Sequence, residues 1–415
     1  MCGNVPGEAL DLNISGNNSA PGQAGIKMAD IDTPRALLDK LVSFPTVSRD
    51  SNLDLVDWVE EWLSGHGIRA NRVYNAQGNK ASLYAHVGPI EPGAVVLSGH
   101  TDVVPVDGQD WTTDPFIVCL RDGRPYGRGT TDMKGFDALA LWAMAQAARS
   151  GVRRPLQIAL SHDEEVGCVG APPMIDHMLK SDMPPGDTVI VGEPSGLACV
   201  TGHKGGFGCE VTVQGFKVHS SIMHTGVSAI MEAARLIDWA NGQNDRNMAA
   251  SPSAVAALIE PPWPPLHTGT ISGGTAHNIT AAECRFGLDF RLVPDEDADA
   301  WRAKMQAQIA AQEAQMKAIA PEAGFTVNEY FAVPALQPER DGSAETLVRR
   351  LTGDNASHAV SYGTEAGQFQ ERGYSAVVCG PGDIAQAHQP DEYITVAQFD
   401  AGRKFMEKLL HELQQ

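Results

Sequence analysis

Four short apolar runs rich in β-branched residues constrain the fold of this chain more than any other feature. They are "AVVLSG" (94–99), "LQIALS" (156–161), "TVIVG" (188–192) and "SAVVCG" (375–380). Their length and composition predict buried strands, and "FDALALWAMAQAARSG" (136–151) between the first two predicts a helix. Parallel strands need such a crossover, so the alternation indicates an α/β layer with a mostly parallel sheet.

The N-terminal part of the chain adds two helix patterns. Thr33 followed by Pro34 is typical of a helix N-cap and first helical position, and apolar residues three and four apart come next. A second helix is predicted at about residues 52–64. Residues 1–27 are rich in Gly, Asn, Ser and Pro and lack the basic and apolar regions of a signal peptide. We therefore expect a disordered leader there, with Met28 as the start of the compact chain.

The middle of the chain shows a different pattern, in which alternating strands and amphipathic helices follow one another. The strand patterns are "GCEVTVQGFKVH" (208–219), "AECRFGLDFRL" (282–292) and "FTVNEYFAV" (325–333), and the helix patterns cover residues 228–240 and 297–319. This predicts a smaller α+β domain of ferredoxin-like type at residues 206–327. It would be inserted into an α/β domain made of residues 28–205 and 328–415.

Charge and cysteine content narrow the possible partners and the compartment. Lys and Arg number 31 against 51 Asp and Glu, a net charge of −20 that repels nucleic-acid phosphates and anionic membrane surfaces. The 7 cysteines are scattered without a C-x-x-C pair, which argues against a disulfide framework or a structural zinc site. No apolar stretch approaches the ~20 residues that a membrane span needs. We expect a cytoplasmic protein that binds neither nucleic acid nor membrane.

Acidic and histidine side chains gather where the predicted strands end. His100 and Asp102 follow the first strand, Glu164 and Glu165 the second, Glu193 the third and His388 the fourth, and Asp132 precedes the helix. The carboxyl ends of parallel strands meet at one edge, where open α/β sheets bind ligands. Taken singly, each residue has an ordinary interpretation, as a loop histidine, a turn aspartate or a solvated glutamate pair. Independent loops have no reason to place so many potential ligands at one edge, so we favour a binding site.

The ligand types in this group favour a divalent metal. Two histidines and several carboxylates without a thiolate suit Zn²⁺ or a similar ion, but not a structural zinc site. The carboxylates outnumber what one tetrahedral ion needs, which favours two ions that share a bridging carboxylate. Neighbouring side chains of an extended segment point opposite ways, so Glu165 can bind metal while Glu164 faces the substrate. Asp102 can accept the imidazole N–H of His100 that does not face metal.

Several segments carry a resemblance to a known family. They are "LSGHTDVVPVDG", "YGRGTTDMKGF", "SHDEEVGCVGA", "VGEPSG", "GGTAHN", "DFR", "GTEAGQF" and "CGPGDIAQAHQPDEY". In this order, from about Thr33 to the C-terminus, they resemble the dizinc aminoacylase and carboxypeptidase family, and most of all its acetylornithine deacetylase branch. The resemblance implies a metallohydrolase with an inserted dimerisation domain, a homodimer, and two divalent ions, Zn²⁺ first with Co²⁺ or Mn²⁺ as alternatives.

The same resemblance implies the metal ligands. His100 and Glu193 would bind separate ions, Asp132 would bridge the two ions, Glu165 would join one ion and His388 the other. It also implies that the Asp132–Met133 peptide is cis.

Further roles for this chain follow from the resemblance. Glu164 matches the family's general base and acid, and Asp102 matches its histidine-orienting residue. His219 matches a residue that polarises the scissile carbonyl. The substrate carboxylate would be bound by Arg291, Asn278, Gly363 and Thr364. His219 would act across the dimer interface; its alternative is a hydrogen bond to Ser220 or Ser221 in its own loop. Glu365 would either bind a cationic side chain of the substrate or form an exposed salt bridge.

The implied reaction is hydrolysis of a small-molecule N-acyl amino acid. The resemblance favours N2-acetylornithine, giving ornithine and acetate in arginine biosynthesis. Glu164 would take a proton from the attacking water and return it to the leaving amine. A broader N-acyl amino acid hydrolase, an acetylcitrulline deacetylase, a succinyl-diaminopimelate desuccinylase and a glutamate carboxypeptidase stay open. A relative that only binds metal or peptide is also open, although it would have no need of Glu164.

Overall fold

The computed structural model describes residues 31–415, and its larger part is built on one eight-stranded sheet. The strands are β1 (Ala70–Tyr74), β2 (Ala81–Val87), β3 (Ala94–His100), β6 (Leu156–Ser161), β7 (Gly186–Pro194), β8 (Val200–His203), β14 (His358–Val360) and β15 (Ser375–Gly380), in the order β1-β2-β6-β3-β7-β15-β8-β14. The expected leader at 1–27 and the expected start at Met28 lie outside the described residues.

The four strands predicted from sequence form the centre of this sheet. β6, β3, β7 and β15 are adjacent, and each neighbouring pair is parallel. The outer strands were not predicted: β1 and β2 extend one edge as antiparallel strands, and β8 joins β15 antiparallel at the other. The prediction of a mostly parallel α/β sheet is confirmed.

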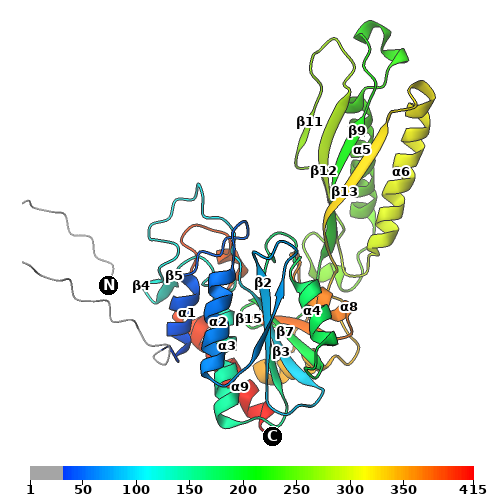
Figure 1. The fold of residues 1–415 in the computed structure, drawn as a ribbon. Coiled ribbons are helices and arrows are strands. Elements are labelled where there is room, and N and C mark those ends of the chain that lie inside the picture. Colours follow the sequence, from blue (N-terminus) through cyan, green and yellow to red (C-terminus); the bar gives the residue numbers. More distant parts are fainter. Residues whose placement is uncertain (1–30) are drawn as a thin grey trace, which may run out of the picture.

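Helices cover both faces of this sheet (Figure 1). One core packs α1 (Pro34–Val42), α2 (Leu53–Gly65), α3 (Lys134–Ser150), α7 (Ser343–Thr352) and α9 (Val396–Leu413), and the other packs α4 (Ala171–Lys180) and α8 (Ala366–Glu371). Alternation along β3 divides the strand between them, since Val95 and Leu97 face the first core and Val96 the second. The predicted cap is present, because the Thr33 hydroxyl accepts the main-chain N–H of Ala36.

A second, antiparallel sheet stands away from the first (Figure 1). It contains β9 (Gly205–Gln214), β10 (Leu266–His267), β11 (Ile271–Gly273), β12 (Glu283–Leu292) and β13 (Gly324–Val333), with α5 (Ala229–Ala249) and α6 (Ala298–Ile319) packed on it. A small hairpin of β4 (Cys119–Arg121) and β5 (Arg124–Tyr126) and the short helices η2 (Ser220–Thr225), η3 (Ala256–Leu258) and η4 (Ile384–Gln386) complete the described elements. We propose the second sheet and its two helices as the inserted domain expected at 206–327; β13 continues to Val333.

Within the described residues, none of the helices combines the length and apolar character that crossing a bilayer requires.

The close approach of α3 to β7 generates a prediction about packing. Gly192 lies where an added Cβ would sit 2.0 Å from the buried ring of Phe136. We expect Gly192→Ala to lower the midpoint of thermal unfolding, because overpacking a filled core costs about 1–3 kcal/mol.

Gly242, inside α5, has no atom within 4 Å of its added Cβ. Gly242→Ala is the matched control and should raise the midpoint slightly, because Ala is favoured over Gly in helices by about 0.5–1 kcal/mol. An unchanged midpoint for Gly192→Ala would contradict this packing.

Candidate metal centre

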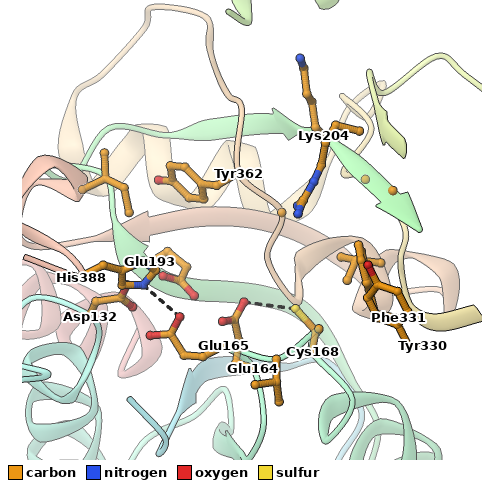
Figure 2. Close-up of a pocket in the computed structure, with 18 residues that line it drawn as sticks. Asp132, Glu164, Glu165, Cys168, Glu193, Lys204, Tyr330, Phe331, Tyr362 and His388 are labelled. Atoms are coloured by element: carbon orange, nitrogen blue, oxygen red, sulfur yellow. Dashed lines mark hydrogen bonds and ion pairs between the residues drawn. The ribbon is translucent and has the colours of Figure 1, made fainter. Parts of the chain in front are cut away.

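A cavity of about 440 Å³ opens at the carboxyl ends of the central strands, between the two sheets. Asp132, Glu164, Glu165, Glu193 and His388 line its floor, and Figure 2 shows these side chains converging from the end of β7 and from the loops around it. His100, at the end of β3, is buried directly beside them. The structure therefore brings together all the residues that the sequence predicted at this sheet edge, as the geometry of parallel strands requires.

The distances among these side chains group them around Asp132. Its Oδ1 lies 3.1 Å from His100 Nε2 and its Oδ2 lies 3.3 Å from His388 Nε2. Glu193 Oε1 lies 3.7 Å from His100 Nε2, and Glu165 Oε2 lies 2.9 Å from His388 Nε2. Each oxygen of Asp132 thus faces a different histidine, as in a carboxylate that bridges two ions.

This geometry favours a different ligand pairing from the expected one. Ligand atoms of one ion lie close together, and His100 is near Glu193 whereas His388 is near Glu165. The expectation that His100 and Glu193 bind separate ions stays untested, and the distances favour the proposal that His100 pairs with Glu193 on one side of Asp132 and His388 with Glu165 on the other. Two groups within 4.8 Å fit a metal: His100, Glu164 and Glu193, and His100, Asp132 and Glu165.

The charges in this cluster do not balance without further cations. Among residues 31–415, only histidines form ion pairs with Asp132, Glu164, Glu165 and Glu193. Burial raises the pKa of Glu164 to about 8 and that of Glu165 to about 7, and it raises the pKa of Glu193 well above its usual range. Glu165 Oε1 is buried without a hydrogen-bond partner. Divalent ions would supply both the missing charge and the missing partner, so the residues fit a metal centre.

The loops that carry the cluster contain uncommon backbone conformations. Asp163 and Cys168, on either side of Glu164 and Glu165, have φ of 58° and 54°, and His388 has φ of 63°. Non-glycine residues in this region are strained, and such strain concentrates at functional sites. The Asp132–Met133 peptide is cis, as the resemblance implied.

Asp102 supports the cluster in a way that differs from the prediction. His100 Nδ1 is hydrogen-bonded to the main-chain oxygen of Asp102 at 2.9 Å, whereas the Asp102 carboxylate is 3.7 Å away. That carboxylate instead accepts the main-chain N–H groups of Glu164 at 3.1 Å and Glu165 at 3.3 Å, and the hydroxyl of Ser48. Asp102 therefore joins the end of β3 to the loop after β6, because those amide donors draw its side chain away from the imidazole.

Glu392 is a supporting residue that the sequence reasoning missed. Its buried carboxylate accepts the main-chain N–H groups of Gly129, Thr131 and Asp132 and pairs with buried Arg128 at 2.8 Å. It thereby fixes the loop that presents Asp132. Its place in the "HQPDEY" segment, four residues after His388, was the available signal.

The wall of the cavity is formed partly by the second sheet. Arg291 of β12 lines it, with Nε 2.9 Å from Asp289 Oδ2 and the guanidinium 5.4 Å from the Phe331 ring centroid. Tyr330 and Phe331 both line the wall because the pairing of β13 with β9 shifts at Tyr330, a β-bulge that overrides the usual alternation. Tyr362 stands above Glu193 (Figure 2). Sequence periodicity gave no signal for the bulge or these aromatic residues.

The segment at 363–365 is only partly exposed to the cavity. Gly363 lines it, but Thr364 is fully buried and its hydroxyl accepts the N–H of Ala366. Glu365 is also buried and is bonded to Ser161 and Ser98. Both expectations for Glu365 are therefore wrong: it is neither in contact with the cavity nor in an exposed salt bridge, because its carboxylate is enclosed under the sheet edge.

His219 and Asn278 do not reach the cavity of their own chain. β9 starts at the cavity wall, and at about 3.3 Å per residue Gln214 lies roughly 30 Å farther along. His219 follows that far end, and the Ser220 N–H donates to the Asn278 main-chain oxygen. His219 Nδ1 is 2.8 Å from the Ser221 hydroxyl, so the local hydrogen bond named as an alternative is present. The two residues lie near each other but away from the metal-binding cluster.

Comparison with known proteins identifies relatives of this chain. The sequence pattern of Peptidase family M20/M25/M40 matches residues 96–412. Acetylornithine deacetylase of Myxococcus xanthus is 34% identical over 376 residues, covering 87% of this chain and 92% of the relative. Acetylornithine deacetylase of Pasteurella multocida is 32% identical over 378 residues, covering 89% and 95%.

Solved structures show the same fold. An M20 family metallo-carboxypeptidase from Sulfolobus solfataricus superposes with a TM-score of 0.73 at 18% identity, covering 92% of this chain and 99% of that one. A Bacillus subtilis protein described as a dinuclear metal binding peptidase superposes with a TM-score of 0.62 at 14% identity, covering 92% and 97%. At these identities the likeness concerns the fold alone.

The pKa shifts in the cluster predict that metal binding is coupled to proton release. Hydrogen bonds that His388 donates to Asp132 and Glu165 raise the pKa of His388 to about 10, so the metal-free imidazole is protonated at neutral pH, and Glu165, with a pKa of about 7, is partly protonated there. Metal ligands must be deprotonated, so Zn²⁺ has to displace these protons. We expect the dissociation constant for Zn²⁺ to rise as pH falls from 8 to 6, about tenfold per pH unit for each proton displaced. Calorimetry in buffers of different ionisation enthalpy would count the protons; affinity independent of pH would contradict this prediction.

Proposed function

Because this chain belongs to Peptidase family M20/M25/M40, we propose that it is a metal-dependent amidohydrolase that cleaves an N-acyl amino acid at the cavity between its two sheets. The observation that carries the proposal is the group of four carboxylates, two on buried and two on half-buried residues, whose ion pairs are made only with His100 and His388 in the described residues. A site that only bound peptide would have no reason to bury this excess of negative charge.

We assign the metal ligands from the geometry. His100 and Glu193 would hold one ion, His388 and Glu165 the other, and Asp132 would bridge them. When bound, such ions polarise a carbonyl and lower the pKa of water at the site. The donor set of nitrogen and oxygen atoms suits Zn²⁺, with Co²⁺ and Mn²⁺ as alternatives.

Glu164 is our candidate for the proton-transfer group. Its side chain projects into the cavity beside the ligands (Figure 2), with Oε1 3.1 Å from Cys168 Sγ and Oε2 4.0 Å from His100 Nε2. His100 has closer partners in Asp132 and Glu193, which leaves Glu164 free of a required ligand role. Glu164 Oε2 would accept a proton from the attacking water and return it to the nitrogen of the leaving amine.

Arg291 is our candidate receptor of the substrate carboxylate. Its guanidinium belongs to the cavity wall, and its planar set of donors matches a carboxylate. Among the described residues, Asp289 engages Nε of this guanidinium, which leaves the terminal nitrogens for a ligand. Gly363 would offer main-chain contacts on the same wall.

The substrate proposed first is N2-acetylornithine, because relatives 31–34% identical to this chain are acetylornithine deacetylases. The test is turnover of N2-acetylornithine against N-acetylcitrulline, N-acetylmethionine, N-succinyl-diaminopimelate and a dipeptide, each with Zn²⁺ restored. Acetylornithine should give the highest kcat/KM. Preference for another N-acetyl amino acid would keep the reaction but change the substrate; cleavage of none would overturn the proposal.

The proposed role of Glu164 predicts the effect of an isosteric substitution. Glu164→Gln keeps the size of the side chain but removes the proton acceptor, so we expect kcat to fall by ~10²–10⁴. Metal content, measured by elemental analysis after dialysis, should stay at the wild-type value. The matched control is Glu165→Gln, which should lose metal as well as activity. A Glu164→Gln protein that loses metal would identify Glu164 as a ligand, and near-normal kcat would exclude it as the base.

We further propose that the chain forms a homodimer through the second sheet. Apolar residues are exposed around the far end of that unit: Phe216, Ile222, Met223, Ile230, Met231, Ile271 and Ile279. Exposed apolar patches of this kind mark interaction surfaces. His219 and Asn278 lie in the same region and would enter the cavity of the partner subunit.

The proposed dimer predicts the result of an experiment in which two inactive variants are mixed. Glu164→Gln and His219→Ala proteins should each be inactive, because each lacks one part of every site. A mixed dimer has both lesions in one site and none in the other, so mixing should restore up to half of the wild-type activity per mixed dimer. Each variant mixed with itself is the control. Absence of recovery despite demonstrated subunit exchange would show that His219 does not act in the partner's site.

The cytoplasmic location expected from the cysteine pattern stays a prediction.

A further inference from the structure

Glu365 is a buried acid directly under the metal centre to which the proposed reaction gives no role. It is 1% exposed and immediately precedes α8. Its Oε1 accepts the hydroxyl of Ser161, and its Oε2 accepts the hydroxyl of Ser98 at 3.3 Å. The carboxylate therefore joins the ends of β6 and β3, the two strands that lead to Glu164 and His100.

The sheet register places this carboxylate beside His100. Ser161 is the direct partner of His100 in the parallel pairing of β3 with β6. Ser98 lies two residues before His100 on the same strand, so its side chain points to the same face. Because Glu365 is bonded to both hydroxyls, its carboxylate lies on the face of the sheet that also carries the His100 imidazole.

The surroundings of Glu365 contain no lysine or arginine to balance its charge. Among the described residues it forms no ion pair with either type, and the ionisable groups near it include His100 and the carboxylates of Asp102 and Asp137. Burial raises the pKa of Glu365 to about 7, which reflects the unfavourable environment for a charge. Glu365 also acts on the pKa values of Glu164 and Cys168, so it lies within electrostatic range of the cavity.

The segment after Glu365 contacts the loop that carries the acid pair. Gln368 Nε2 donates to the main-chain oxygen of Cys168 at 3.0 Å. One short segment thus holds both strand ends and the loop at 164–168. Two serine hydroxyls would suffice to join the strands, so hydrogen bonding alone gives no reason to bury an acid here.

We infer that Glu365 is a positioning residue of the metal centre, whose buried carboxylate raises the affinity for divalent cations without contacting them. The inference rests on the metal ligation proposed above. The carboxylate is expected to lower the stability of the metal-free chain and to raise the affinity for metal. In the metal-free chain the carboxylate is a buried charge without a lysine or arginine partner and opposes folding, whereas bound cations would favour it.

The test uses Glu365→Gln, which keeps the side-chain size and can still bond both hydroxyls. Zn²⁺ affinity is measured at pH 8 by competition with a chromophoric chelator, and the unfolding midpoint of the metal-free chain is measured separately. We expect the dissociation constant for Zn²⁺ to rise about 10–100-fold, the usual effect of losing a group that supports metal ligands. The metal-free midpoint should equal or exceed that of the wild type. Asp187→Asn removes an exposed charge at the opposite end of β7 and should leave the Zn²⁺ affinity unchanged.

The outcomes separate this inference from the proposed function. Unchanged Zn²⁺ affinity in Glu365→Gln overturns it, and so does a metal-free variant that is less stable than the wild type or fails to fold, because the carboxylate would then be a structural clamp. A wild-type chain that binds no Zn²⁺ overturns the proposed function and this inference together. A variant that binds Zn²⁺ as tightly as an active wild type overturns the inference alone.

Discussion

The concentration of buried negative charge at one sheet edge is the constraint on which the rest of this structure depends. Asp132, Glu164, Glu165 and Glu193 converge on two histidines, and Glu365 adds a further carboxylate beneath them. In the absence of cations such a group opposes folding, so the surrounding structure has to hold it in place. Main-chain amides do much of this: Glu392 fixes the loop of Asp132, and Asp102 fixes the loop of the acid pair. Both supports are acids themselves, so the site is surrounded by groups that favour cations.

The central part of the fold and the cluster of acids and histidines at the sheet edge were predictable because both follow from one rule. Four apolar runs predicted β3, β6, β7 and β15, and the crossover requirement made them parallel. Parallel strands place their carboxyl ends together, so residues as distant in sequence as His100 and His388 could be assigned to one site before any contact was known. The prediction needed only the order of strands and ligands along the chain.

The features that sequence reasoning missed depend on contacts that leave no periodic signal. The bulge at Tyr330 turns two consecutive aromatic residues toward the cavity, whereas alternation predicts only one. The partner of the Asp102 carboxylate is set by amide groups in a distant loop, and the pairing of His100 with Glu193 by the spacing of β3 and β7. No signal in the sequence indicates that Glu365 is buried. Its burial follows from the position of the segment before α8 in the folded chain.

The shape of the second sheet explains why one inserted unit can serve two roles. Both of its connections to the first sheet lie at the cavity, since Gly205 begins β9 and Val333 ends β13 there. The two connecting segments of this chain pass close to each other at this point. A Cβ on Gly205 would lie 2.3 Å from the main-chain nitrogen of Ala335, so glycine is required there. The near end of the unit therefore supplies Arg291 and Phe331 to its own cavity, while β9 carries His219 away along its full length. Under the proposed dimer, the length of β9 sets which chain each polar group serves. An inserted unit with a shorter β9 would keep Arg291 in place but would withdraw His219 from the partner's site.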